Sequence, residues 1–168
     1  MGTITQSPPG KMREIIEKAV IRFCGDSGDG IQVTGNQFTN TVALYGNDLA
    51  TFPDYPAEIR APKGTLPGVS GFQVHFGSTE IYTPGDAVDA LVVMNPAALK
   101  MNLADLKKNG ILIVNEDNFE AGDLKKAQMT SNPLEDHTLD AYRLFPVELM
   151  KLTSAALKDL GLDAKSVD

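Results

Sequence analysis

The part of the sequence richest in candidate binding residues is FCGDSGDGIQVTG, residues 23–35, which follows an apolar run and precedes an amphipathic one. Its candidate binding residues are Gly25, Ser27, Gly28, Asp29 and Gly30. Glycines before a helix leave backbone N–H groups accessible, and the positive end of the helix dipole favours an anion there. The pattern indicates either an anion-binding turn or a self-satisfied turn, capped by Asp26 or Asp29 and shaped for a protein contact.

Known nucleotide-binding fingerprints match this turn only in part. Read from Gly28, the dinucleotide pattern G-x-G-x-x-G has Val33 at its third glycine position, although Asp48 stands at a plausible distance for the ribose-binding acid. The thiamine diphosphate motif begins with G-D-G, but residues 55–58 hold no asparagine to close it. Binding of NAD or FAD therefore remains an alternative, and a complete thiamine diphosphate site is not predicted.

A second candidate segment is the Pro- and Gly-rich stretch 53–71, which is too irregular for a helix or strand and long enough to be a functional loop. Within it, Arg60 and Lys63 suit contact with a carboxylate or phosphate, or else form surface ion pairs. Cys24 precedes a helix and has either a lowered pKa or a packing role. No histidine has a second ligand at metal-binding spacing.

The elements that must position these residues alternate between strands and helices. Strands are expected at 19–24, 48–52, 72–76, 90–94, 111–114 and 142–145, and helices at 12–18, 31–45, 96–106 and 148–160. Asn95 and Pro96 form a helix-start signal, and Gly46 suits a helix end. The order predicts an α/β fold with a parallel or mixed sheet covered on both faces.

Length and composition limit the class of protein. The 168 residues correspond to about one domain. Residues 1–11 are expected to form a flexible leader and residues 12–168 a single domain. The polar C-terminal residues 161–168 follow directly after a predicted helix, which is consistent with a fragment of a longer chain. The net charge of −7 argues against nucleic acid and anionic membranes. A single cysteine excludes an iron–sulfur cluster held by this chain alone. A cytoplasmic location is expected.

Three segments carry a family resemblance: IRFCGDSGDGIQVTGNQFT, FPDYPAEIRAPKGTLPGVSGFQVHFGS and TPGDAVDALVVMNPAAL. They resemble the γ-type domain of 2-oxoacid:ferredoxin (acceptor) oxidoreductases, in the form fused to the N-terminus of the α subunit of 2-oxoglutarate-type enzymes. The likeness covers residues 20–160. It implies a Rossmann-like three-layer α/β domain with a mostly parallel sheet and helices on both faces.

The resemblance also implies an enzyme complex in which this chain alone is inactive. Thiamine diphosphate attacks a 2-oxo acid, carbon dioxide leaves, electrons pass through [4Fe–4S] clusters to ferredoxin, and coenzyme A takes the acyl group. Thiamine diphosphate, Mg²⁺ and the clusters belong to a pyrimidine-binding α domain and a β subunit, and coenzyme A is the candidate ligand of the γ-type domain.

Residues of both candidate segments match the family's signatures. The glycine-rich turn matches the first signature, and Arg60, Gly64 and Thr65, with Lys63 beside them, match the second. The alternatives are a stand-alone nucleotide-binding module and a non-catalytic interaction domain.

Overall fold

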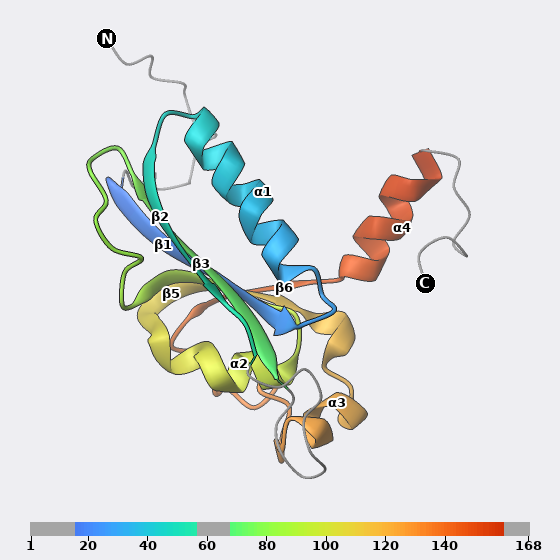
Figure 1. Cartoon of the computed structure of the whole chain (residues 1–168). Coiled ribbons are helices and arrows are strands. Elements are labelled where there is room, and N and C mark those ends of the chain that lie inside the picture. Colours follow the sequence, from blue (N-terminus) through green and yellow to red (C-terminus); the bar gives the residue numbers. More distant parts are fainter. Residues whose placement is uncertain (1–15, 57–67, 160–168) are drawn as a thin grey trace, which may run out of the picture.

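The computed structural model describes residues 16–56 and 68–159. Figure 1 shows the elements in chain order. They are β1 (Lys18–Asp26), α1 (Ile31–Leu44), β2 (Asp48–Asp54), β3 (Val69–Gly77), β4 (Val88–Val93), α2 (Pro96–Asn102), η1 (Leu103–Asp105), β5 (Leu106–Asn115), η2 (Glu116–Asn118), α3 (Ala121–Lys126), β6 (Arg143–Val147) and α4 (Leu149–Asp159).

The strands form one six-stranded sheet in the order β2-β3-β1-β4-β5-β6. β1, β4, β5 and β6 pair in parallel, whereas β3 runs antiparallel to both β1 and β2. Five of the six strands therefore point the same way, and the expected α/β fold with a mostly parallel sheet is confirmed. The two outermost strands, β2 and β6, each contain a proline, Pro53 and Pro146.

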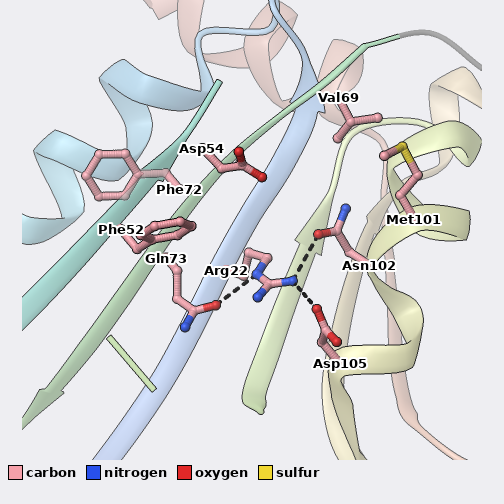
Figure 2. A pocket seen from close by; sticks show the side chains of 10 residues that line it. Arg22, Phe52, Asp54, Val69, Phe72, Gln73, Met101, Asn102 and Asp105 are labelled. Carbon is pink, nitrogen blue, oxygen red and sulfur yellow. Dashed lines mark hydrogen bonds and ion pairs between the residues drawn. The ribbon is translucent and has the colours of Figure 1, made fainter. Parts of the chain in front are cut away.

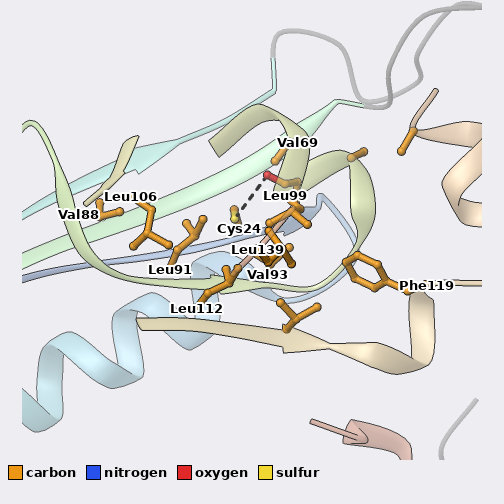
Figure 3. Packing of buried hydrophobic residues seen from close by; sticks show 14 of the residues in the cluster. Cys24, Val69, Val88, Leu91, Val93, Leu99, Leu106, Leu112, Phe119 and Leu139 are labelled. Carbon is orange, nitrogen blue, oxygen red and sulfur yellow. Dashed lines mark hydrogen bonds between the residues drawn. The ribbon is translucent and has the colours of Figure 1, made fainter. Parts of the chain in front are cut away.

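The two faces of the sheet bury separate apolar clusters because side chains alternate along each strand. On β1, Phe23 packs with Ile31 of α1 on one face. Its neighbour Cys24 lies on the other face with Leu99 of α2, as Figure 3 shows. Figure 1 shows α1 over the first face and α2 and α3 over the second, which is the expected three-layer arrangement.

The predicted helix signals at residues 46 and 95 are confirmed. Asn95 precedes α2, and its side-chain oxygen accepts a hydrogen bond from the Ala98 N–H at 2.9 Å, while Pro96 occupies the first turn. Gly46 follows α1 with a φ of 78°, a left-handed conformation that glycine adopts at little cost.

Several expected boundaries were wrong. Of the helix expected at 12–18, residues 12–15 lie outside the described residues, and Ile16–Lys18 are not helical because Lys18 already pairs with Gly77 in the sheet. The helix expected at 96–106 is shorter: α2 ends at Asn102, the chain continues as η1, and β5 begins at Leu106. α3 was not predicted. The leader 1–11 lies outside the described residues.

The segment 53–71 is shorter as a loop than expected, because β2 extends to Asp54 and β3 begins at Val69. At the other end of the chain, α4 follows β6 and extends away from the sheet (Figure 1). Its first turn is held by Asp117, whose carboxylate accepts a hydrogen bond from the Met150 N–H at 2.8 Å.

Candidate functional site

The glycine-rich turn between β1 and α1 closes on itself. The Asp29 N–H donates to the Asp26 carbonyl at 3.0 Å, and the Asp26 N–H donates to the Asp29 carboxylate at 2.7 Å. Gly30 precedes α1 with a φ of 69°, and no side chain caps the helix. The expectation that an aspartate caps α1 was wrong, because Asp29 turns back toward β1.

The three glycines of this turn have different roles. A Cβ at Gly25 would lie 2.5 Å from an Asp29 carboxylate oxygen and 2.9 Å from the Met94 Cβ, so the closed turn requires glycine there. A Cβ at Gly28 or Gly30 would meet nothing within 4 Å. The surface above Gly28 and Gly30, including the uncapped start of α1, is thus open to another molecule.

Although Asp29 lies in an exposed turn, partial desolvation of its carboxyl raises its pKa above its ordinary value. The hydrogen bond from the Asp26 N–H lowers it, and the neighbouring Asp26 carboxylate raises it again. Asp26 is itself engaged, since one of its carboxylate oxygens accepts a hydrogen bond from the Asn95 side chain at 2.9 Å. Both aspartates therefore have partners within the chain.

Asn95 joins the turn after β1 to the turn after β4. Its oxygen caps α2 and its nitrogen binds Asp26. Next to it, the Met94 N–H donates to the Cys24 carbonyl at 3.0 Å and the Met94 carbonyl accepts from the Asn118 side chain at 3.1 Å. After β1 the chain adds strands on one side of the sheet, β2 and β3, and after β4 it adds them on the other side, β5 and β6. The gap between the ends of β1 and β4 is therefore the topological switch point of the sheet. In α/β sheets, ligands bind at this position, beyond the carboxyl ends of the strands.

The ends of the second candidate segment lie at the same edge of the sheet. Val69, at the start of β3, pairs with Asp26 at the end of β1. Gln32 in the first turn of α1 donates from its side-chain nitrogen to the Ser70 hydroxyl at 3.0 Å and to the Gly71 carbonyl at 2.9 Å. The segment therefore leaves and re-enters the sheet beside the glycine-rich turn.

Sequence reasoning placed some of these residues and missed others. Ser27, Gly28, Asp29 and Gly30 form one exposed turn, and Gly25 is buried near the end of β1, just before it. Arg60, Lys63, Gly64 and Thr65 lie outside the described residues. The linking roles of Gln32 and Asn95 were not foreseen; the helix-start signal of Asn95 was visible, but its bond to Asp26 spans 69 positions of sequence.

Cys24 packs in the core, which was one of its two expected roles. Its side chain is fully buried, and its thiol donates to the Val92 carbonyl at 3.4 Å. Burial raises the pKa of the thiol to about 12, although the nearby Arg22 guanidinium lowers it in part. At neutral pH this thiol is protonated, so it does not act as a nucleophile.

Comparison with known proteins decides the family. The model of the family described as pyruvate ferredoxin/flavodoxin oxidoreductase matches residues 20–165. This chain belongs to that family. The 2-oxoglutarate oxidoreductase subunit KorA of Mycobacterium tuberculosis is 52% identical over 153 residues, which cover 91% of this chain. The chain spans 23% of the length of that oxidoreductase subunit.

Solved structures of oxidoreductases share the fold. The 2-oxoglutarate:ferredoxin oxidoreductase of Magnetococcus marinus, solved with 2-oxoglutarate, coenzyme A and succinyl-CoA bound, gives a TM-score of 0.64 at 23% identity, over 86% of this chain and 22% of that one. The γ subunit of a keto/oxoacid ferredoxin oxidoreductase from Geobacter sulfurreducens gives 0.56 at 19% identity, over 83% and 65%. The pyruvate oxidoreductase subunit PORC of Thermotoga maritima gives 0.54 at 18% identity, over 85% and 68%.

The predicted resemblance to this oxidoreductase family is thereby confirmed. The family match does not support the alternative of a stand-alone nucleotide-binding module. In the described part of the chain, no helix is long and apolar enough to cross a membrane.

Proposed function

We propose that this chain acts as the γ-type domain of a 2-oxoacid:ferredoxin oxidoreductase that uses 2-oxoglutarate. The observation that carries the proposal is the 52% identity, over 91% of this chain, to a 2-oxoglutarate oxidoreductase subunit. In the proposed reaction, 2-oxoglutarate loses carbon dioxide, the electron pair passes to ferredoxin, and coenzyme A accepts the succinyl group. The work of this domain is to cover the active site and to assist coenzyme A binding.

The single cysteine of this chain does not suit an iron–sulfur cluster. The one thiol, Cys24, is buried and protonated, whereas cluster ligands are thiolates. Among the described residues, no three His, Cys, Asp or Glu side chains gather where they could hold a metal ion. On the family resemblance, we assign thiamine diphosphate, Mg²⁺ and the clusters to the pyrimidine-binding α domain and the β subunit, and we expect the chain alone to be inactive.

The glycine-rich turn and the arginine-bearing segment are the proposed coenzyme A contacts. The open backbone at Gly28 and Gly30 lets a ligand approach, and the uncapped start of α1 offers N–H groups to a phosphate. Arg60 and Lys63 belong to the segment whose ends, Asp54 and Val69, lie at the same edge of the sheet. A phosphate at the start of α1 would meet these N–H groups, and in this proposal Arg60 and Lys63 add the positive charge that offsets the two engaged aspartates.

The test uses the enzyme assembled with its α and β partners. Replacing both Arg60 and Lys63 by Ala is expected to raise the KM for coenzyme A about tenfold or more, since a charge-assisted hydrogen bond contributes about 1.5–3 kcal/mol. The KM for 2-oxoglutarate should stay unchanged. Lys108→Ala removes an exposed cation from β5 and serves as the control.

An unchanged KM for coenzyme A in the Arg60→Ala, Lys63→Ala double variant would instead support the alternative of an interaction domain that covers the active site without contacting a cofactor. Turnover of 2-oxoglutarate by the purified chain with thiamine diphosphate and coenzyme A, without other proteins, would refute the proposal outright. Calorimetric titration with NAD separates the remaining alternative, because tight NAD binding by the lone chain is the result that a nucleotide-binding module requires.

A further inference from the structure

The α1 side of the sheet is covered over only part of its width. α1 packs against β1, β2 and β3. Phe23, Val92, Ile113 and Phe145 pair in register across β1, β4, β5 and β6, so their side chains form one row on that side. Phe23, packed against α1, is 8% exposed, whereas Val92 and Ile113 are only half-buried and Phe145 is 52% exposed. Parallel strands normally have both faces covered, so this row lacks part of its cover.

The uncovered part, an open strip formed by Val92, Ile111, Ile113 and Phe145, has the width of one helix. Neighbouring strands lie about 4.8 Å apart, so β4, β5 and β6 together span about 10 Å, close to the diameter of a helix with its side chains. At the end of β5, on the same side, the Asn115 side-chain oxygen is buried and has no hydrogen-bond partner among the described residues. The open strip therefore offers an apolar floor and an unmet acceptor.

α4 is an amphipathic helix that lacks such a floor. Leu149, Leu152 and Ala156 recur at helical spacing and form one apolar stripe, and Leu152 is 58% exposed. Of the described residues in the two apolar clusters, none belongs to α4. With 11 residues α4 is about 16 Å long, and β6 with five residues has about the same length. The chain thus holds an unpartnered helix and an open strip of matching size.

The two surfaces are also alike in carrying no charge. α1, which flanks the open strip, has no charged residue over Ile31–Leu44, although it lies on the surface and Val33 is 65% exposed. The α4 segment LTSAAL, residues 152–157, is likewise uncharged. Charged residues are depleted from the centres of protein interfaces, because removing them from water is costly. Docking of α4 on the strip beside α1 brings uncharged surfaces together.

The connection between β6 and α4 determines which sheet α4 can cover. β6 ends at Val147 and α4 begins at Leu149, so Glu148 alone joins them. A strand and a helix that returns over the same sheet are usually joined by 2–6 residues. Here α4 extends away from the sheet instead (Figure 1), and Asp117 holds its first turn at the Met150 N–H. Short hinges of this kind favour exchange of the helix between two copies.

We propose that α4 covers the open strip of a second copy of this chain. Leu152 and Ala156 of one copy pack on Ile113 and Phe145 of the other, and a two-fold axis generates the reverse contact. Because the exchange is reciprocal, both open strips are covered and both α4 helices gain a floor. This inference goes beyond the proposed function, since it concerns how copies of the domain associate.

The first test is sedimentation velocity of the full 168-residue chain at concentrations up to about 100 µM, where we expect a dimer. Insertion of Gly-Ser-Gly after Glu148 lengthens the hinge to an ordinary strand-to-helix connection, so α4 can return over its own sheet. This variant should be a folded monomer. The same insertion after Thr79, an exposed residue between β3 and β4, is the control and should remain a dimer.

Two substitutions test the surfaces themselves. Phe145→Ser in the open strip and Leu152→Asp on α4 should each raise the Kd of the dimer about a hundredfold or more, because each removes two buried apolar side chains per dimer. Phe52→Ser on β2 and Leu44→Asp at the end of α1 are the controls. These side chains are 53% and 88% exposed and lie outside the strip, so the Kd should stay unchanged. Both test side chains are more than half exposed in a single copy, so neither variant is expected to unfold it.

Each outcome decides for or against the exchange. A dimer that the hinge insertion converts to a monomer, and that both test substitutions weaken, supports it. A parent chain that stays monomeric at about 100 µM would overturn it, as would a hinge-insertion variant that dimerises as tightly as the parent. Equal weakening by the control substitutions would also contradict it. These measurements need neither coenzyme A nor other subunits, so a negative result leaves the proposed function in place.

Discussion

Replacement of Gly35 by Ala should destabilise the domain, although alanine is the better helix former. Gly35 is buried in α1 where the helix approaches β3, and a Cβ there would lie 2.2 Å from the Phe72 Cγ and 2.3 Å from its Cδ1. Restoring an ordinary contact of 3.4 Å requires the helix or the ring to move by about 1.2 Å. Such a shift also separates Ile31 from the cluster that it shares with Phe72.

The expected loss combines two opposing effects. Overpacking a core lowers the free energy of unfolding by about 1–3 kcal/mol. We expect a value near the upper end here, because the added Cβ would overlap the Phe72 ring itself. Against this, alanine has a helix propensity about 1 kcal/mol more favourable than that of glycine. The net loss is therefore about 2 kcal/mol, which corresponds to a fall in Tm of about 4–8 °C for a domain of this size.

Thermal and urea unfolding of the full chain measure this change. Gly122→Ala in α3 is the matched control, because a Cβ there meets nothing within 4 Å. That variant should be as stable as the parent or up to about 1 kcal/mol more stable. If Gly35→Ala unfolded at or above the Tm of the parent, the close approach of α1 to β3 would be wrong.

Three further predictions concern the turns and the buried thiol. Asn95→Ala should lower stability by about 1 kcal/mol, measured by urea unfolding, because the cap of α2 and the bond to Asp26 are both lost. Because folding raises the pKa of Asp29, protonation of this carboxyl stabilises the folded state at low pH, and this stabilisation is lost as pH rises above about 4. Asp29→Asn should flatten this part of the curve of unfolding free energy against pH, with no loss of stability at pH 7. Cys24 should react with a thiol reagent at pH 8 only in urea, and rapid labelling of the native chain would contradict its burial.

The order and type of most elements could be predicted because their signals are local. The apolar run ending at Cys24, the Asn95–Pro96 helix start and Gly46 each act within a few residues of chain. α3 lacked such a signal, because six residues with a single leucine show no helical periodicity. The reversed direction of β3 has no local signature at all, since direction depends on which strand it pairs with.

The candidate site shows the same limit. The glycine-rich turn was found from composition, but its internal closure depends on where the Asp29 carboxylate points, which spacing does not determine. The hydrogen-bonded cluster around Arg22, which Figure 2 shows, was not foreseen. The partners Gln73, Asn102 and Asp105 lie 51, 80 and 83 positions away in sequence, so only the folded sheet brings them together.

The prolines in the two outermost strands restrict how this domain joins its neighbours. Pro53 in β2 and Pro146 in β6 each remove a backbone donor from a border of the sheet. A continuous intermolecular sheet through β2 or β6 is thereby disfavoured, as is edge-to-edge aggregation. Side chains of the helical layers and the turns are then favoured over strand pairing as the surfaces through which a neighbouring subunit would bind.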